Sequence, residues 1–198
     1  MNNFYRILFF VFSSLILFSL NLKAENSTII DGDSLMKKAD SYRESDRGKN
    51  KYYLNRAFDF YNNENNKTGL AKINNKLSKW YSDENQIDTA LGLALDALKY
   101  ADELGDSLLS SEVYLNLGII YYNLKNDKIS KQYYLDAITY GSIFVKASAT
   151  ANIGLIYSDN NIEDTALIFF KKANRIFLSM KDTSSKVLSN IATTNMNM

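Results

Sequence analysis

The chain repeats one short phrase in a fixed register. The segment "YLNLGIIY" occupies residues 114–121, and "TANIGLIY" occupies residues 150–157. In both, an asparagine precedes a glycine by two residues and a tyrosine follows that glycine by three, although the whole chain contains only eight glycines. Recurrence at a period of this size indicates a protein built from stacked structural units, and it restricts the fold more than any other feature of the sequence.

The shared register extends well beyond the two quoted phrases. A serine replaces the glycine in an earlier copy, 40 residues before Gly118, and the tetrapeptide "DTAL" recurs at residues 88–91 and 164–167 with the same offset that separates Ser78 from Gly154. A weaker copy contains Ala39, Tyr42, Tyr53 and Ala57. The predicted structural positions of the repeat are Ser78, Tyr81, Ala90, Ala97, Gly118, Tyr121, Tyr134, Ala137, Gly154, Tyr157, Ala166, Phe170 and Ala173.

The spacing within each copy predicts pairs of helices. Apolar residues recur at three and four residues, and the chain contains no proline to interrupt a helix. Small residues such as Gly118 and Gly154 are expected where a partner helix comes close, with Tyr121 and Tyr157 filling the space one turn further on. The expected pairs are 33–44 with 50–62, 69–82 with 86–104, 108–124 with 128–140, and 143–158 with 162–179.

Turn residues mark the ends of these helices. Gly105, Asp106 and Ser107 predict a helix stop followed by the cap of the next helix, and Gly141 predicts another stop. Asp31 is expected to cap the first helix.

These positions resemble the tetratricopeptide repeat, a helix–turn–helix unit of about 34 residues. Leu117, Gly118 and Tyr121 match its first helix, and Tyr134 and Ala137 match its second. The chain departs from the family pattern in lacking the closing proline, in placing Ser78 and Ser130 at small-residue positions, and in its periods of 40 and 36 residues. The resemblance implies an all-α, right-handed solenoid of helical hairpins, of the kind found in exported or sensor regions of bacterial signalling proteins.

The first residues are typical of a secretory signal peptide. A single basic residue, Arg6, precedes the uncharged run at residues 7–20, and Ala24 is the expected cleavage site. This predicts a periplasmic or extracellular protein, or one anchored in the membrane by residues 7–20 if the segment is not cleaved. The remaining chain divides into a divergent first helix pair at 25–68, three repeats at 69–182 (about 70–106, 107–142 and 143–182), and an incomplete fifth repeat at 183–198 with a helix near 184–193.

Composition weighs against several classes of function. The chain contains no histidine and no cysteine, so it lacks the commonest general base and metal ligand as well as any thiolate. We therefore expect no enzyme activity, no cofactor and no metal. Removal of residues 1–24 leaves 21 basic and 22 acidic side chains, which does not favour nucleic acid as a partner.

One set of motifs offers a remote alternative. The chain contains Ser34-x-x-Lys37, residues 67–69 "KTG" and residues 158–160 "SDN", which together are the signatures of serine β-lactamases. Their order differs from the family order, and that family places Lys-Thr-Gly on a strand where this sequence predicts none. Hydrolysis of a chromogenic β-lactam that is lost on Ser34→Ala would support the alternative.

The resemblance also implies a concave groove lined by the first helix of each pair. It predicts a non-catalytic module that binds a peptide or a partner helix; the alternative is a truncated sensor segment of a membrane signalling protein, such as a kinase or a transcription regulator. Neither the identity of the partner nor the oligomeric state follows from the sequence. The expected groove positions are Lys72, Asn75, Lys79, Ser82, Glu112, Leu115, Ile119, Tyr122, Asn123, Ala151, Leu155 and Ser158, with Ser148 and Asp159 beside them.

Overall fold

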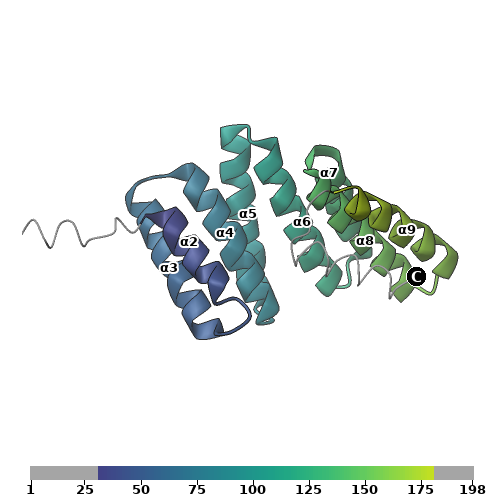
Figure 1. Ribbon diagram of the computed structural model, residues 1–198, viewed down its shortest axis with the longest axis horizontal. Coiled ribbons are helices and arrows are strands. Elements are labelled where there is room, and N and C mark those ends of the chain that lie inside the picture. Colours follow the sequence, from purple (N-terminus) through teal and green to yellow (C-terminus); the bar gives the residue numbers. More distant parts are fainter. Residues whose placement is uncertain (1–30, 181–198) are drawn as a thin grey trace, which may run out of the picture.

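The computed structural model describes residues 31–180, which form eight helices and no strand (Figure 1). Every helix end lies within three residues of its predicted position. The all-α prediction is therefore confirmed for the described residues. The helices are α2 (Gly32–Ser41), α3 (Arg47–Asn63), α4 (Lys67–Asp83), α5 (Ile87–Leu104), α6 (Ser107–Asn123), α7 (Asp127–Tyr140), α8 (Ile143–Asp159) and α9 (Glu163–Ser179).

The helices pair into four hairpins that stack in chain order: hairpin 1 is α2–α3, hairpin 2 is α4–α5, hairpin 3 is α6–α7 and hairpin 4 is α8–α9 (Figure 1). First helices also contact the first helices of adjacent hairpins, as α2 with α4, α4 with α6 and α6 with α8. Within residues 31–180 the second helices make no such contacts with one another. The stack is thus a solenoid whose inner surface consists of α2, α4, α6 and α8.

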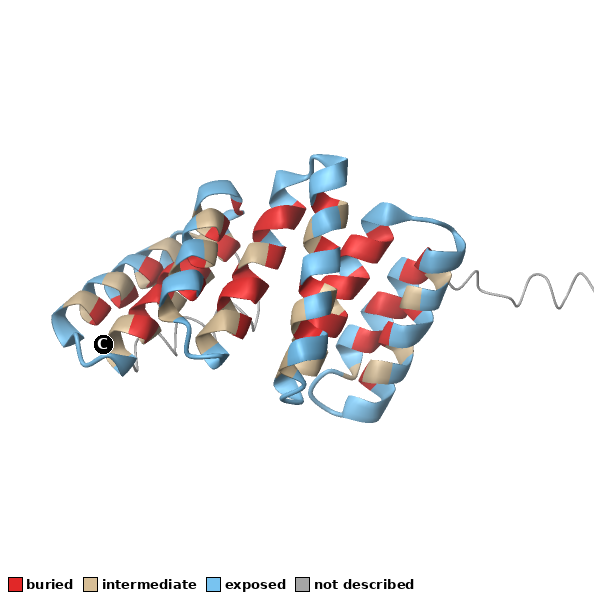
Figure 2. Ribbon diagram, turned by 180° about the vertical axis from the view of Figure 1, so that it is seen from behind, coloured by how far each residue is buried: buried red, intermediate tan, exposed pale blue. Residues whose placement is uncertain are grey.

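The repeated glycines lie where two helices of a hairpin meet. A β-carbon at Gly118 would overlap the ring of Tyr134, and one at Gly154 would lie 2.8 Å from the ring of Phe170. Both rings are almost completely buried. The prediction that these glycines admit a partner helix is confirmed, and the buried positions follow the helix sides that face neighbours (Figure 2).

Hydrogen bonds from side-chain hydroxyl or amide groups reinforce the contact between the two helices in hairpins 1, 2 and 3. Ser130 of α7 donates its hydroxyl hydrogen to the carbonyl oxygen of Gly118 at 2.8 Å. In hairpin 2 the direction is reversed, since Ser78 of α4 donates to the carbonyl oxygen of Ala90 at 2.7 Å. The two serines that depart from the family pattern therefore occupy the same contact from opposite sides.

Hairpin 1 follows the same scheme, although its sequence signal is weak. The side-chain amide of Asn50 donates to the carbonyl oxygen of Ala39 at 2.8 Å. Tyr42 stacks on Tyr53 with ring centroids 5.7 Å apart. Similar stacks recur in hairpins 3 and 4, where Tyr121 meets Tyr133 at 5.5 Å and Tyr157 meets Phe169 at 5.4 Å.

The turns are fixed by residues that tolerate left-handed backbone or cap a helix. Gly105 has φ +65°, as expected of a helix stop, and Asp106 then accepts a hydrogen bond from the backbone of Leu109. Asp31 caps α2 in the predicted way. Gly141 ends α7 with an extended backbone instead of a left-handed one, because its neighbour Ser142 caps α8 directly.

Two predictions fall on parts of the chain outside the described residues. The signal peptide at 1–24 precedes residue 31, and the helix near 184–193 follows residue 180. Among residues 31–180, no helix combines the length and the apolar character needed to cross a membrane.

Candidate binding groove

A groove of about 320 Å³ lies on the inner surface, at the ends of α2 and α4 and the starts of α3, α6 and α8. Five of the side chains that line it are basic and three are acidic, and two are aromatic. It is therefore a mixed surface with a basic excess, in a chain that is almost neutral as a whole. The lining residues are Met36, Asp40, Arg43, Arg47, Asn50, Leu54, Lys72, Asn75, Lys76, Lys79, Trp80, Asp83, Glu112, Leu115, Ser142, Phe144 and Val145.

The groove contains part of the predicted set of residues. Five expected positions line it: Lys72, Asn75, Lys79, Glu112 and Leu115. The remaining predicted positions also lie on first helices, namely α4, α6 and α8, but they do not line the groove. They are Ser82, Ile119, Tyr122, Asn123, Ala151, Leu155 and Ser158.

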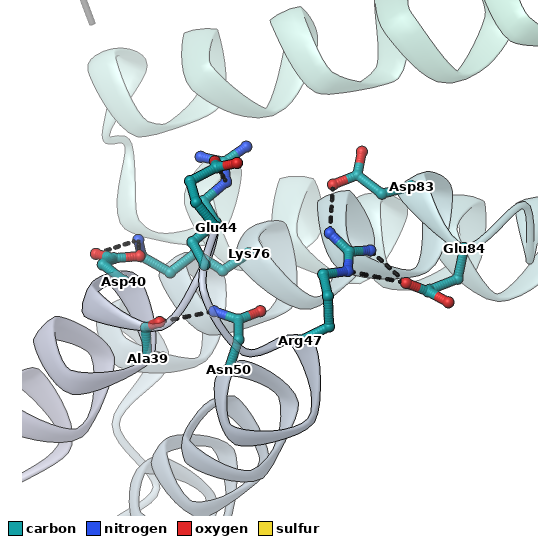
Figure 3. Close-up of polar contacts among 9 residues, drawn as sticks. Ala39, Asp40, Glu44, Arg47, Asn50, Lys76, Asp83 and Glu84 are labelled. Atoms are coloured by element: carbon teal, nitrogen blue, oxygen red, sulfur yellow. Dashed lines mark hydrogen bonds and ion pairs between the residues drawn. The ribbon is translucent and has the colours of Figure 1, made fainter. Parts of the chain in front are cut away.

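Ion pairs join hairpins 1 and 2 along the groove (Figure 3). The ammonium group of Lys76 lies 2.8 Å and 2.9 Å from the two carboxylate oxygens of Asp40. Arg47 contacts Glu84 through Nε at 3.0 Å, and it also reaches Asp83 at 3.4 Å. Hydrogen bonds to these acids, with that to Glu84 the largest contribution, raise the pKa of Arg47. The two acidic residues that line this side of the groove, Asp40 and Asp83, are thus each paired with a cation.

Trp80, the single tryptophan of the chain, lies on α4 in the wall of this region. Its ring lies 4.2 Å from the ammonium group of Lys51 and 5.6 Å from the guanidinium carbon of Arg47, which are cation–π distances. Trp80 is partly exposed although its indole Nε1 is buried, so we expect its fluorescence to change when a molecule contacts this part of the groove.

The floor of the groove includes a buried polar junction between hairpins 2 and 3. The side-chain amide of Asn116 on α6 donates to the side-chain oxygen of Asn75 at 3.0 Å and to the hydroxyl of Ser78 at 2.9 Å. Asn75 retains only 4% of its exposure and Asn116 only 1%. Asn75 therefore lines the groove mainly as a structural residue, with its oxygen already engaged.

The opposite end of the groove is more apolar. Leu115 of α6 is part of the core cluster that includes Val145 of α8, and Phe144 packs edge-on against Phe177 with centroids 6.0 Å apart.

Beyond the groove, Tyr122 donates to Asp159 at 2.6 Å. Burial, followed by this hydrogen bond, raises the pKa of Tyr122 to about 12.

The three β-lactamase-like motifs lie on different helices. Ser34 is in the first turn of α2, Ser158 is near the end of α8, and these two helices make no contact within the described structure. Lys67 begins α4 and pairs with Glu103 at 2.7 Å. The motifs do not converge on one cleft. Residues 31–180 contain no group of three or more acidic residues placed to hold a metal ion.

Several groove residues did not emerge from the repeat register. Arg43 lies in the link between α2 and α3, and Arg47 begins α3. Trp80 directly follows the expected position Lys79, and Phe144 lies one helical turn before Ser148. An aromatic residue adjacent to, or one turn from, an expected groove position is the only sequence signal that would have identified Trp80 and Phe144.

Comparison with known proteins supports the fold alone. No family model and no curated protein matches the chain. Among solved structures, the crystal structure of BtubC (BKLC) from P. vanneervenii is similar, with a TM-score of 0.64 and 19% sequence identity. The match covers 94% of this chain and 82% of that chain. At this identity the likeness extends to the helical architecture and not to a function.

Proposed function

We propose that the protein is a non-catalytic, tetratricopeptide-like interaction module that binds a peptide or a partner helix in the groove described above. The observation that carries the proposal is the groove itself, about 320 Å³ in volume and formed by the first helices of consecutive hairpins together with the start of α3. Repeat solenoids present such extended concave surfaces to their partners. The signal-like segment at residues 1–24 further supports an exported module.

The chemistry of the groove suits a peptide better than a small metabolite. Its walls combine a tryptophan, a phenylalanine, buried amides and several charges over the span of four hairpins. Aromatic and basic side chains are the types that dominate binding energy at protein interfaces. A ligand that crosses α4, α6 and α8 would meet charged groups at one end and apolar groups at the other.

The test is selection of peptides from a random displayed library by the full-length protein. We expect selected peptides to change the fluorescence of Trp80, because this residue is the only tryptophan and lies in the groove wall. We also expect Phe144→Ala to weaken their binding. Tyr140→Ala is the matched control, since its exposed ring on α7 does not line the groove.

The outcomes separate groove binding from adhesion elsewhere. Equal loss of affinity in both variants, or binding without any change in Trp80 fluorescence, would place the peptide outside the groove. Thermal denaturation of each variant verifies that the helices remain folded, because Phe144 also contacts Phe177.

A further inference from the structure

The end of α9 lies close to the inner surface of hairpin 4. Met180, which follows this helix, packs against the buried cluster around Ala147 and Phe177. Phe144 and Ala151 of α8 pack against the same cluster, and Phe144 also lines the groove. The backbone of Met180 is extended, with φ −75° and ψ 129°, so the chain leaves the helix there. The chain that continues from Met180 therefore departs from a point near the inner surface.

The inner face of α8 carries a stripe of uncharged side chains, here called the α8 stripe. It consists of Phe144, Ser148, Ala151 and Leu155, whose spacings of four, three and four residues place them on one side of the helix. All four residues are partly buried. The inner face of α4 instead presents two of the lysines that line the groove. The α8 stripe is thus the part of the inner surface that suits apolar side chains.

One polar atom on the α8 stripe has an unused capacity for hydrogen bonding. The hydroxyl oxygen of Ser148 is buried, and it has no hydrogen-bond partner within the described residues. Buried hydroxyl groups nearly always have a partner in folded proteins. A polypeptide backbone laid along the stripe carries both donors and acceptors, so it would satisfy this oxygen as a purely apolar ligand would not.

A segment of suitable chemistry follows α9 in the chain itself. The run "KVLSNIA" at residues 186–192, outside the described residues, contains Val187, Leu188 and Ile191 within an otherwise polar sequence. The α8 stripe extends about 16 Å along its helix. The link at residues 181–186 spans up to about 20 Å when fully extended, so the run can reach any part of the stripe from Met180.

We propose that the run at residues 186–192 binds along the α8 stripe of its own chain, with Val187, Leu188 and Ile191 against it, and competes there with an external peptide. Competition follows because Phe144 belongs to both the stripe and the groove. A short tether gives such a segment an effective concentration on the order of millimolar, so a weak contact is enough. The competition rests on the proposed function, whereas the contact within the chain does not.

The absence of cysteine allows a direct test by disulfide trapping in the full-length protein. Ser148→Cys with Ser189→Cys should form an intramolecular disulfide under mild oxidation, since this bond requires β-carbons about 4 Å apart. The comparison pair is Leu167→Cys with Ser189→Cys. Leu167 has the register position on α9 that Lys131 has on α7, where the ammonium lies 5.2 Å from the Tyr157 ring of the next hairpin. Stacking of the run as a fifth repeat would therefore trap the comparison pair.

Competition is measured with the peptides selected from the displayed library. Ile191→Asp should raise their affinity about fivefold, because a binding-competent state that is only partly populated weakens the apparent affinity by its fraction. Thr194→Asp adds the same charge outside the run and is the matched control, so it should leave the affinity unchanged. Circular dichroism of each variant verifies that the helices remain folded.

The two experiments separate the contact from the competition. A disulfide with Leu167→Cys and none with Ser148→Cys, or no disulfide in either pair, would overturn the proposed contact. Trapping at Ser148→Cys together with equal peptide affinities in Ile191→Asp and Thr194→Asp would overturn the competition. If no library peptide binds any variant, the proposed function fails, and the disulfide pairs still decide whether the run lies on the α8 stripe.

Discussion

Hairpins 2 and 3 bring their helices together at equivalent positions but use residues of different size and reversed hydrogen-bond direction. In hairpin 2 the donor is Ser78 on the first helix, and the acceptor is the carbonyl oxygen of Ala90. In hairpin 3 the donor is Ser130 on the second helix, and the acceptor is the carbonyl oxygen of Gly118. One hydroxyl satisfies the contact in each case, from whichever helix carries it.

The side-chain volumes at this contact between the two helices also differ between hairpins 2 and 3. Gly118 in hairpin 3 faces the buried ring of Tyr134, whereas Ala94 takes the place of that ring in hairpin 2, where the first helix contributes Ser78. A helix pair thus requires a suitable combined volume and not a particular residue at either position. This tolerance explains how a hairpin stack can share its architecture with a structure at only 19% identity.

Removal of the large ring should give the greatest loss of stability. Tyr134 is 1% exposed, so Tyr134→Ala should lower the free energy of unfolding by about 3–5 kcal/mol through lost burial and a cavity. Urea denaturation followed by circular dichroism measures the change. Tyr140→Ala is the control, because that ring is 53% exposed. Similar losses in the two variants would show that Tyr134 does not fill the contact.

Replacing Gly118 of hairpin 3 by serine, the residue at the equivalent position of hairpin 2, should also destabilise the protein, by a smaller amount than Tyr134→Ala. Gly118→Ser adds a β-carbon that overlaps the Tyr134 ring, and overpacking of this kind costs about 1–3 kcal/mol. In Gly118→Ser with Tyr134→Ala the overlap is gone. The double variant should therefore be more stable than the sum of the two single losses predicts, by at least about 1 kcal/mol. Strict additivity would contradict the exchange of volumes.

The junction between the two hairpins offers a third measurement. Asn116→Leu removes the amide that donates to Asn75 and Ser78, and it leaves buried oxygens without that partner. We expect a loss of about 2 kcal/mol in the free energy of unfolding, the typical cost of an unsatisfied buried group. Asn123→Leu, at an exposed position of the same helix, should change stability by less than about 0.5 kcal/mol. Equal effects would mean that the amide network does not hold the junction.

The hairpins could be predicted from the sequence because their signals are local. A left-handed glycine at Gly105, a cap at Asp106 and small residues such as Gly154 act within one turn or one helix pair. Their spacing can therefore be recognised from the amino-acid sequence alone. The ends of the helices and the all-α class follow from that spacing.

The groove could be predicted only in part, because its residues meet across hairpins. Asn75 lies on the expected face of α4, yet a partner from the next hairpin buries it, and no register of a single helix reveals that pairing. Arg43 and Arg47 reach the groove from the link at 42–46 and the start of α3, where hairpin 1 has a longer turn than the one at 84–86. Because of this longer turn, Arg43 and Arg47 do not correspond to any groove position that was transferred from the repeat register.

The turns within hairpins 2 and 3 allow a direct comparison, and the expected changes in stability are the smallest of those considered. Both place a left-handed residue at the middle of the turn, Asn85 with φ 58° and Lys125 with φ 57°. Asparagine adopts this backbone at lower cost than lysine, so Lys125→Asn should raise the free energy of unfolding by about 0.5 kcal/mol. The ion pair that it loses with Asp159 spans 3.8 Å, with 77% of the lysine side chain exposed, and contributes little. Asn85→Lys should lower stability by a similar amount, and both changes are measurable by urea denaturation. Opposite signs from these two reciprocal substitutions would establish that the backbone of the turn, and not the particular neighbours of each residue, sets the preference. A loss of stability in both would assign the effect in hairpin 3 to the contacts of Lys125 with Asp159 and with the ring of Tyr122.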